Sequence, residues 1–169
     1  MRNYWLISDT HFSHVNILKF TDENGELIRG KVFSSVEEMD EAMIENWNSV
    51  VKPGDYVYNL GDVTFNMKKY QEGIHPRLNG SKRLIVGNHD DIKKMAATNM
   101  WAKIELWRMF PELGILMTHL PIHESGLRDN MINIHGHIHH NPSPTDRHRC
   151  VCVEQINYTP VNIDEYIQT

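Results

Sequence analysis

The sequence has only two cysteines and no long apolar segment. Cys150 and Cys152 stand two positions apart in a short apolar stretch, where a shared strand disfavours a disulfide bond between them, so we expect both to be reduced. No stretch approaches the roughly 18 consecutive apolar residues of a membrane span, and the N-terminal apolar run is too short for a signal peptide. We therefore expect a cytoplasmic protein without a membrane segment.

The chain also lacks an excess of basic charge. It has 17 Lys and Arg against 22 Asp and Glu, a formal net charge of −5. Extended nucleic-acid surfaces need clustered Lys and Arg, so no such surface is expected. Repeats, linkers and low-complexity segments are absent as well. The 169 residues predict one domain over 1–169, large enough to bury about 70% of its unfolded surface. Nothing in the sequence predicts an oligomeric state.

Histidine, by contrast, is abundant. The chain has eleven, and His135, His137, His139 and His140 fall within six positions. Imidazole is the commonest metal ligand among protein side chains. In an extended segment alternate residues point to the same side, so His137 and His139 would present their nitrogens together, with Cα atoms about 7 Å apart. The tract on its own also fits a metal-sequestering segment or a loop with stray histidines.

Short apolar segments alternate with helical patterns along the chain. Val36, Met39, Met43, Trp47 and Val50 recur at helical spacing after Ser34 and Ser35, either of which can cap a helix. Strands are predicted at 4–7, 56–60, 83–86, 131–134 and 151–153, with a hairpin of 103–109 and 115–118. Further helices are expected around 70–78 and 92–98, and 159–167 reads as a helix or as a strand followed by a turn. This alternation predicts an α/β fold.

Polar side chains follow several of these strands directly. Sites in open α/β sheets form at the carboxyl ends of strands. If Asp9 and His11 lie on an extended segment, both face one way and can chelate one ion. Each pattern alone has an ordinary explanation, such as a turn or a structural histidine. The strand ends in question read Asp9-Thr-His11, Gly61-Asp62, Gly87-Asn88-His89-Asp90, Thr118-His119 and Gly136-His137-Ile-His139.

Taken in this order, the five motifs resemble the calcineurin-like metallophosphoesterase superfamily, in particular its small bacterial and phage-type phosphoesterases. The resemblance spans residues 4–140. It implies a four-layer α/β/β/α fold, a two-sheet β-sandwich flanked by helices. It also implies two divalent metal ions, the first held by Asp9, His11 and His139, the second by Asn88, His119 and His137, with Asp62 bridging both. Nitrogen and oxygen ligands without thiolate suit Mn, Fe, Zn, Ni or Co, and Mn is favoured.

The resemblance also implies a mechanism. A metal-bridging hydroxide would attack phosphorus in line with the leaving oxygen, and His89 would be the general acid. Asp90 would either orient His89 or cap a helix that begins at Ile92. One departure stands out, because Phe65 occupies a position that is polar in many members of the superfamily.

Other residues are weaker candidates. His14, Asn16 and His123 are candidate substrate contacts, and His135 is expected to support the histidine tract. His75, His140 and His148 are expected to face solvent. Arg29, Lys31 and Arg128 are candidate phosphate contacts, although exposed basic residues usually have no specific role.

The leading hypothesis is therefore a metallophosphoesterase, with a phosphodiesterase acting on a small or nucleotide-like phosphodiester slightly favoured over a phosphomonoesterase. The tract from His135 to His140 superficially resembles that of metallo-β-lactamase-like hydrolases, but it has no Asp and comes late in the chain. A non-enzymatic alternative is a histidine-rich metal-binding protein.

Overall fold

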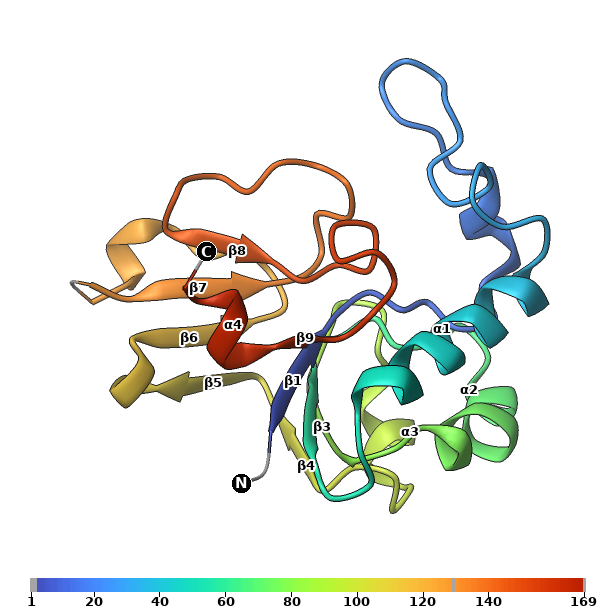
Figure 1. Ribbon diagram of the computed structural model, residues 1–169, viewed down its shortest axis with the longest axis horizontal. Helices are drawn as coiled ribbons and strands as arrows, with labels where there is room; N and C mark the ends of the chain where they lie inside the picture. Colours follow the sequence, from blue (N-terminus) through green and yellow to red (C-terminus); the bar gives the residue numbers. More distant parts are fainter. Residues whose placement is uncertain (1–2, 129, 169) are drawn as a thin grey trace.

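The computed structural model describes residues 3–128 and 130–168 and contains two β-sheets (Figure 1). The first sheet has five strands in the order β4-β3-β2-β1-β9. Strands β1 to β4 are parallel, and β9 pairs antiparallel with β1. Their bounds are Tyr4–Ile7 (β1), Tyr56–Asn59 (β2), Ser81–Ile85 (β3), Lys103–Glu105 (β4) and Val161–Asn162 (β9).

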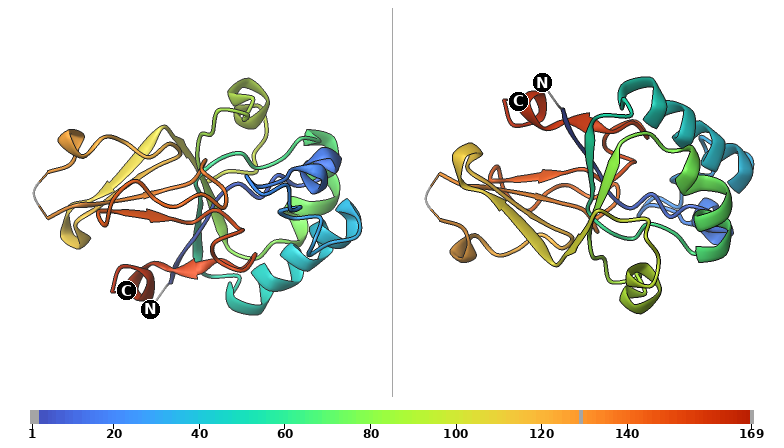
Figure 2. Two further views of the ribbon diagram at one scale, coloured as in Figure 1. Left: turned by 90° about the horizontal axis from the view of Figure 1, so that it is seen from above. Right: turned by 90° about the horizontal axis from the view of Figure 1, so that it is seen from below.

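The second sheet has four strands in the order β5-β6-β7-β8. Strand β5 is antiparallel to β6, whereas β6, β7 and β8 run parallel. Their bounds are Trp107–Phe110 (β5), Ile115–Thr118 (β6), Ile132–His135 (β7) and His148–Cys150 (β8). The views in Figure 2 place this sheet on the side of the first sheet that faces away from helix α1.

Helix α1, Val36–Val50, is the longest helix of the described chain. Ser35 caps it by accepting a hydrogen bond from the backbone N–H of Glu38, and Glu37 and Glu38 lie at its positive N-terminal end. The remaining helices are short. They are η1 (Val15–Lys19), α2 (Met67–Lys69) continued by η2 (Tyr70–Ile74) and η3 (His75–Arg77), α3 (Ile92–Ala96), η4 (Pro111–Leu113), η5 (Glu124–Gly126) and α4 (Ile163–Tyr166).

One hydrophobic core contains residues of both sheets and of α1. Leu6 of β1, Met117 of β6, Ile134 of β7 and Trp47 of α1 belong to the same buried cluster. Burial of this kind supplies most of the favourable free energy of folding. Among the described residues, no helix combines the length and the apolar character that crossing a bilayer requires.

The α/β prediction is confirmed, and most predicted elements lie within two residues of their observed bounds. The predicted hairpin arm 103–109 is wrong as one element. Lys103–Glu105 pairs with β3 in the first sheet, Trp107–Phe110 pairs with β6 in the second, and the chain changes sheet at Leu106. The last strand is likewise misplaced, because pairing with β7 ends at Cys150 and Cys152 makes only an isolated bridge with Ser8. Residues 159–167 form both a two-residue strand and a helix.

Candidate metal centre

All the predicted ligands lie in the turns that follow five parallel-paired strands. Asp9 and His11 follow β1, Asp62 follows β2, and Asn88 follows β3. His119 follows β6, and the last two ligands follow β7. The carboxyl ends of parallel strands share one edge of a sheet, so the turns after β1, β2 and β3 lie together in the first sheet and those after β6 and β7 lie together in the second.

The first group of ligands consists of Asp9, His11 and His139. One ligand atom from each lies within 4.8 Å of the others. Nε2 of His11 and Nε2 of His139 are each 3.7 Å from Oδ1 of Asp9. Asp9 and His11 are almost completely buried, whereas His139 is partly exposed. The first predicted ligand set is therefore brought together.

The second group consists of Asp62, His119 and His137, again with ligand atoms within 4.8 Å of one another. Asn88 belongs to the same group, because its Oδ1 lies 2.9 Å from Nε2 of His119 and 2.9 Å from Nδ1 of His137. The structure thus also brings the second predicted set together.

Asp62 lies between the two groups. Its Oδ1 accepts a hydrogen bond from the backbone N–H of His89 at 2.8 Å. Its Oδ2 is 3.8 Å from Nε2 of His11 in the first group and 3.4 Å from Nε2 of His119 in the second. One carboxylate oxygen therefore faces both groups, which is the placement that a bridging ligand requires.

Two buried polar atoms of the first group are without a hydrogen-bond partner. They are Oδ1 of Asp9 and Nε2 of His11. Oδ2 of Asp9, in contrast, accepts from Oγ of Ser8 at 2.6 Å, from the N–H of His137 at 2.8 Å and from Sγ of Cys152 at 3.3 Å. Buried polar atoms are normally paired, and a cation between these two would satisfy both. The donor atoms present fit a divalent ion.

Hydrogen bonds fix the orientation of two of the imidazoles. Nδ1 of His119 donates to the carbonyl of Leu60 at 2.6 Å, and Nδ1 of His139 donates to Oε1 of Glu154 at 2.9 Å. A proton held on Nδ1 leaves the lone pair of Nε2 free to ligate. In each ring it is this Nε2 that faces a ligand carboxylate.

The ligand turns are not extended, contrary to the expectation for Asp9-Thr-His11 and His137-Ile-His139. Nine non-glycine residues of the described chain have positive φ, and five of them are ligands. Their φ values are 56° for Asp9, 48° for His11, 53° for Asp62, 70° for His137 and 51° for His139. Such left-handed backbone is uncommon outside glycine and concentrates at functional sites. The turns send His137 and His139 to different groups.

Two motif glycines occupy positions where a Cβ atom has no room. Gly61 has a φ of +99°, and a Cβ there would lie 2.5 Å from the backbone N of Gly87 and 2.8 Å from Nδ1 of His119. A Cβ on Gly136 would lie 2.0 Å from Oγ of Ser8 and 2.4 Å from Oδ2 of Asp9. These glycines let the ligand turns pack directly against each other.

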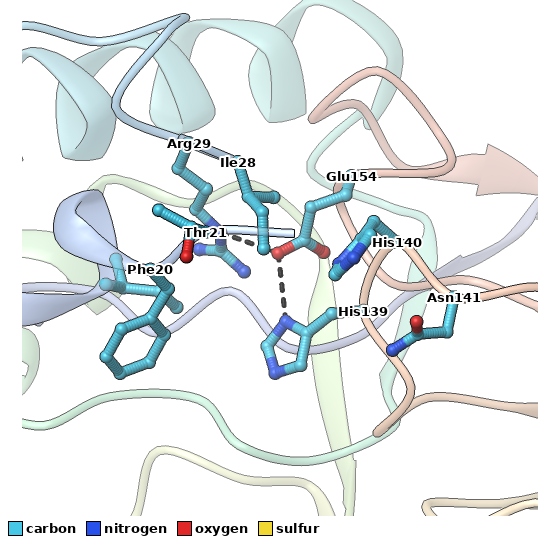
Figure 3. Close-up of a pocket in the computed structure, with 9 residues that line it drawn as sticks. Phe20, Thr21, Ile28, Arg29, His139, His140, Asn141 and Glu154 are labelled. Atoms are coloured by element: carbon cyan, nitrogen blue, oxygen red, sulfur yellow. Dashed lines mark hydrogen bonds and ion pairs between the residues drawn. The ribbon is translucent and has the colours of Figure 1, made fainter. Parts of the chain in front are cut away.

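A buried ion pair contacts the first group through its ligand His139. Glu154 lies between His139 and Arg29, whose Nε is 2.8 Å from Oε1 of Glu154 (Figure 3). Arg29 is fully buried and also donates to the carbonyls of Asp9 and Thr10. Burial opposes ionisation of Glu154, but Arg29 and His139 lower its pKa to about 2. Arg29 is therefore not an exposed phosphate contact, and sequence reasoning did not identify Glu154.

His89 and Asp90 lie beside the second group, in the turn after β3. The His89 side chain is exposed, with its ring centroid 5.2 Å from that of Phe65 and 6.1 Å from that of His11. Asp90 accepts hydrogen bonds from the backbone N–H groups of Asp62, Val63 and Gly87.

Neither expected contact of Asp90 is found. The residue that caps α3 is Asp91, and the hydrogen bonds of the Asp90 carboxylate join the turns after β2 and β3. Burial raises the pKa of Asp90. Asp90 thus fixes the position of Asp62 relative to the turn that carries Asn88 and His89.

The three candidate substrate contacts differ in their surroundings. His14 lies at the first group, with Nδ1 3.3 Å from Nδ1 of His11 and its ring stacked on Phe65 at a centroid distance of 3.8 Å. Burial lowers the pKa of His14 to about 4. Asn16 is exposed and accepts from Nζ of Lys19, and His123 is exposed and caps η5. No contact brings Asn16 or His123 to the ligands within the described chain.

Two of the three histidines that were predicted to face solvent are not exposed. His148 is buried and bonds to the carbonyl of Ile122 and to Thr145, so the solvent-facing prediction is wrong for it. His75 is half-buried against Tyr70 and Trp101, which also contradicts that prediction. His140 is exposed as predicted. His135 is fully buried, and its Nδ1 lies 2.9 Å from the carbonyl of Gly136 in the tract.

Fold and site together define a two-sheet α/β protein with two adjoining groups of side chains that could each hold a metal ion. No family model matches the chain. It is 35% identical to the uncharacterized protein MJ1445 of Methanocaldococcus jannaschii, over 97% of this chain and 89% of the relative, and it belongs to the same family as that protein.

Two further similarities extend over most of the chain. The gene 66 protein of Mycobacterium phage L5 is 29% identical over 88% of this chain and 82% of its own. The crystal structure of the protein of unknown function AQ665 from Aquifex aeolicus matches with a TM-score of 0.74 and 28% identity, over 98% of this chain and 97% of that one. The fold is thus shared along nearly the whole chain.

Proposed function

We propose that this protein is a binuclear metal-dependent phosphoester hydrolase of the calcineurin-like metallophosphoesterase superfamily, with Mn as the favoured ion. The observation that carries the proposal is the position of Asp62. Its Oδ2 faces His11 on one side and His119 on the other, between two groups that each offer at least three ligand atoms.

The chemistry of the site suits a phosphate ester. Two divalent ions, when bound, supply a bridging water of lowered pKa and a clamp for the phosphoryl oxygens. The protein contributes two ligand carboxylates, Asp9 and Asp62, against the four positive charges of such a pair of ions. The site then carries a net positive charge and attracts an anionic group, although the chain as a whole is acidic.

His89 is the proposed general acid. It comes directly after Asn88, its backbone N–H binds Asp62, and its side chain is exposed beside His11 and Phe65. From this position the imidazole can donate a proton to a leaving oxygen held at the first group. His14, at the edge of the same group, is the one substrate-contact candidate that the geometry favours.

The proposal includes the four-layer α/β/β/α arrangement in one domain over residues 1–169. Helices α1 and α2 lie on one side of the five-stranded sheet (Figure 1) and form one outer layer. Beyond Ala96 the described chain offers only α4 and the short turns η4 and η5 for the other layer. The proposed arrangement would therefore have a much smaller second helical layer than first.

A phosphodiester is the slightly favoured substrate, because Asn88 and His89 beside the ligand groups are exposed, and an open site suits a diester better than a monoester that must be enclosed. The alternative enzyme is a phosphomonoesterase. A metallo-β-lactamase-like site is disfavoured, because His137 and His139 belong to separate ligand groups. The non-enzymatic alternative is a histidine-rich metal-binding protein.

Hydrolysis of two aryl substrates by metal-depleted and reloaded protein tests the proposal. We expect Mn to restore hydrolysis of bis(4-nitrophenyl) phosphate, with weaker turnover of 4-nitrophenyl phosphate, and we expect Asp9→Asn to abolish both. His123→Asn serves as a matched control, since this exposed histidine caps η5 and contacts no ligand in the described chain. Bound metal without hydrolysis of either ester would favour the metal-binding alternative.

A further inference from the structure

An apolar groove adjoins the second ligand group, and most of its lining side chains cannot bind metal. It has a volume of about 360 Å³. Asn88 and His119 of the second ligand group line it together with Leu106, Leu120 and Ile122. A second hollow of about 350 Å³ shares Leu106, Thr118 and Ile122 with it and continues over Trp107 and Met109. The two form one path from the ligands to the edge of the second sheet.

The side chains along this path are exposed to an unusual degree for their size and hydrophobicity. Leu106 is 70% exposed, Trp107 57% and Leu120 49%. Leu106 stands where the chain passes from β4 to β5, and Leu120 directly follows the ligand His119. Contiguous exposed apolar surface on a soluble domain marks a binding region more often than it arises by chance.

The lining indicates the chemistry of the occupant. No Lys, Arg, Asp or Glu lines either hollow. A second phosphate or a charged sugar phosphate would find no partner there. An alkyl or aryl group would instead remove Leu106, Leu120 and Trp107 from water.

The occupant must also be connected to the ligand groups, because the groove is continuous with Asn88 and His119. Under the proposed function, a phosphate held between the two groups would direct one ester substituent toward His89 and the other toward this groove. The ring of His89, the proposed general acid, lies near His11 and Phe65, and none of these three residues lines either hollow. The groove therefore faces the ester group that the phosphate retains.

We propose that this groove, from Asn88 to Trp107, is the subsite for an apolar retained ester group, so that the substrates are phosphodiesters with an aliphatic or aromatic substituent beside the phosphate. The inference rests on the proposed function and narrows its substrate class. Leu106 and Leu120 are its specificity-determining residues.

A series of 4-nitrophenyl alkyl phosphodiesters tests the inference, because the leaving group stays constant while the retained group grows from methyl to hexyl. With Mn-loaded protein and monomeric substrate, we expect kcat/KM to rise by at least about tenfold from methyl to hexyl, the direction that burial of each added methylene predicts. In Leu106→Ser/Leu120→Ser the hexyl-to-methyl ratio should fall below about three. Leu113→Ser is the matched control, since Leu113 is an exposed leucine on η4 that lines neither hollow.

The outcomes separate the subsite from the catalytic proposal. Hydrolysis of the methyl ester by the wild type without a dependence on chain length overturns the subsite and leaves the hydrolase proposal intact. The same dependence in the double variant as in the wild type also overturns it. Sedimentation velocity measures the oligomeric state of the double variant. If that state changes while the hexyl-to-methyl ratio does not, the surface is a contact between copies of the chain instead. Absence of hydrolysis of every ester overturns both proposals.

Discussion

The Oε1 atom of Glu154 lies 2.9 Å from Nδ1 of His139 and 2.8 Å from Nε of Arg29. The carboxylate therefore joins a ligand histidine to a fully buried arginine. A carboxylate that accepts from the second nitrogen of a ligand histidine fixes its tautomer and orients its ring. Glu154 thus holds the His139 ring in place. His139 is the one partly exposed side chain among the three ligands of the first group, so it has the least packing to fix its orientation.

Replacing Glu154 with glutamine should weaken metal binding at the first group. The amide keeps the shape but loses the charge that holds the proton on Nδ1 of His139, and changes of this kind cost about 10–100-fold in metal affinity. Calorimetric titration of metal-depleted protein with Mn measures the effect. Glu41→Gln is the control, because Glu41 pairs with Arg77 at the surface. Equal affinity in all three proteins would show that Glu154 has no such role.

Replacing Arg29 with methionine should destabilise the fold itself. Glu154 would be left as a buried charge with only His139 as a partner, and the carbonyls of Asp9 and Thr10 would lose a donor. Breaking a buried ion pair in this way costs about 3–5 kcal/mol of the free energy of unfolding. Urea denaturation of metal-free protein measures the loss. Arg77→Met, which removes an exposed partner of Glu41, should cost little, and equal losses for the two variants would contradict the role of Arg29.

Replacing His89 with asparagine should reduce turnover without removing metal. General acid catalysis contributes about 10²–10⁴-fold, and it matters most when the leaving oxygen is a poor leaving group. We expect a large loss of kcat for an alkyl leaving group and a smaller loss for 4-nitrophenolate, with metal content unchanged by elemental analysis. A loss of the same size for both leaving groups would argue against proton donation by His89.

The positions of the candidate ligands were predictable from the sequence, because each one belongs to a motif that comes directly after a short apolar run that forms a strand. Asp9, Asp62, Asn88, His119 and His139 all lie where those patterns put them. The local backbone was not predictable, since nothing in Asp9-Thr-His11 distinguishes an extended segment from a turn with positive φ. The sequence did not predict that the chain changes sheet at Leu106 either, because residues 103–109 contain no residue that is typical of turns.

The support of the ligands depends on long-range contacts that a single sequence does not display. Arg29 and Glu154 are 125 positions apart, and only the tertiary structure joins them behind His139. The contacts of Asp90 were also not predictable from the sequence, although they join residues that are less far apart. Its sequence neighbours suggest a helix cap, but its carboxylate binds backbone N–H groups 27 and 28 positions away.

The stoichiometry of bound metal in wild-type protein and in Asp62→Asn tests the central claim most directly. Oδ2 of Asp62 faces both ligand groups, so its loss should affect both ions. After loading with Mn and removal of the free ion, elemental analysis should give two ions per chain for the wild type and for Asp164→Asn, whose carboxylate is exposed on α4. Asp62→Asn, with its fold verified by circular dichroism, should retain neither ion. One ion retained at full occupancy in Asp62→Asn, or a single ion in the wild type, would contradict a binuclear centre bridged by Asp62.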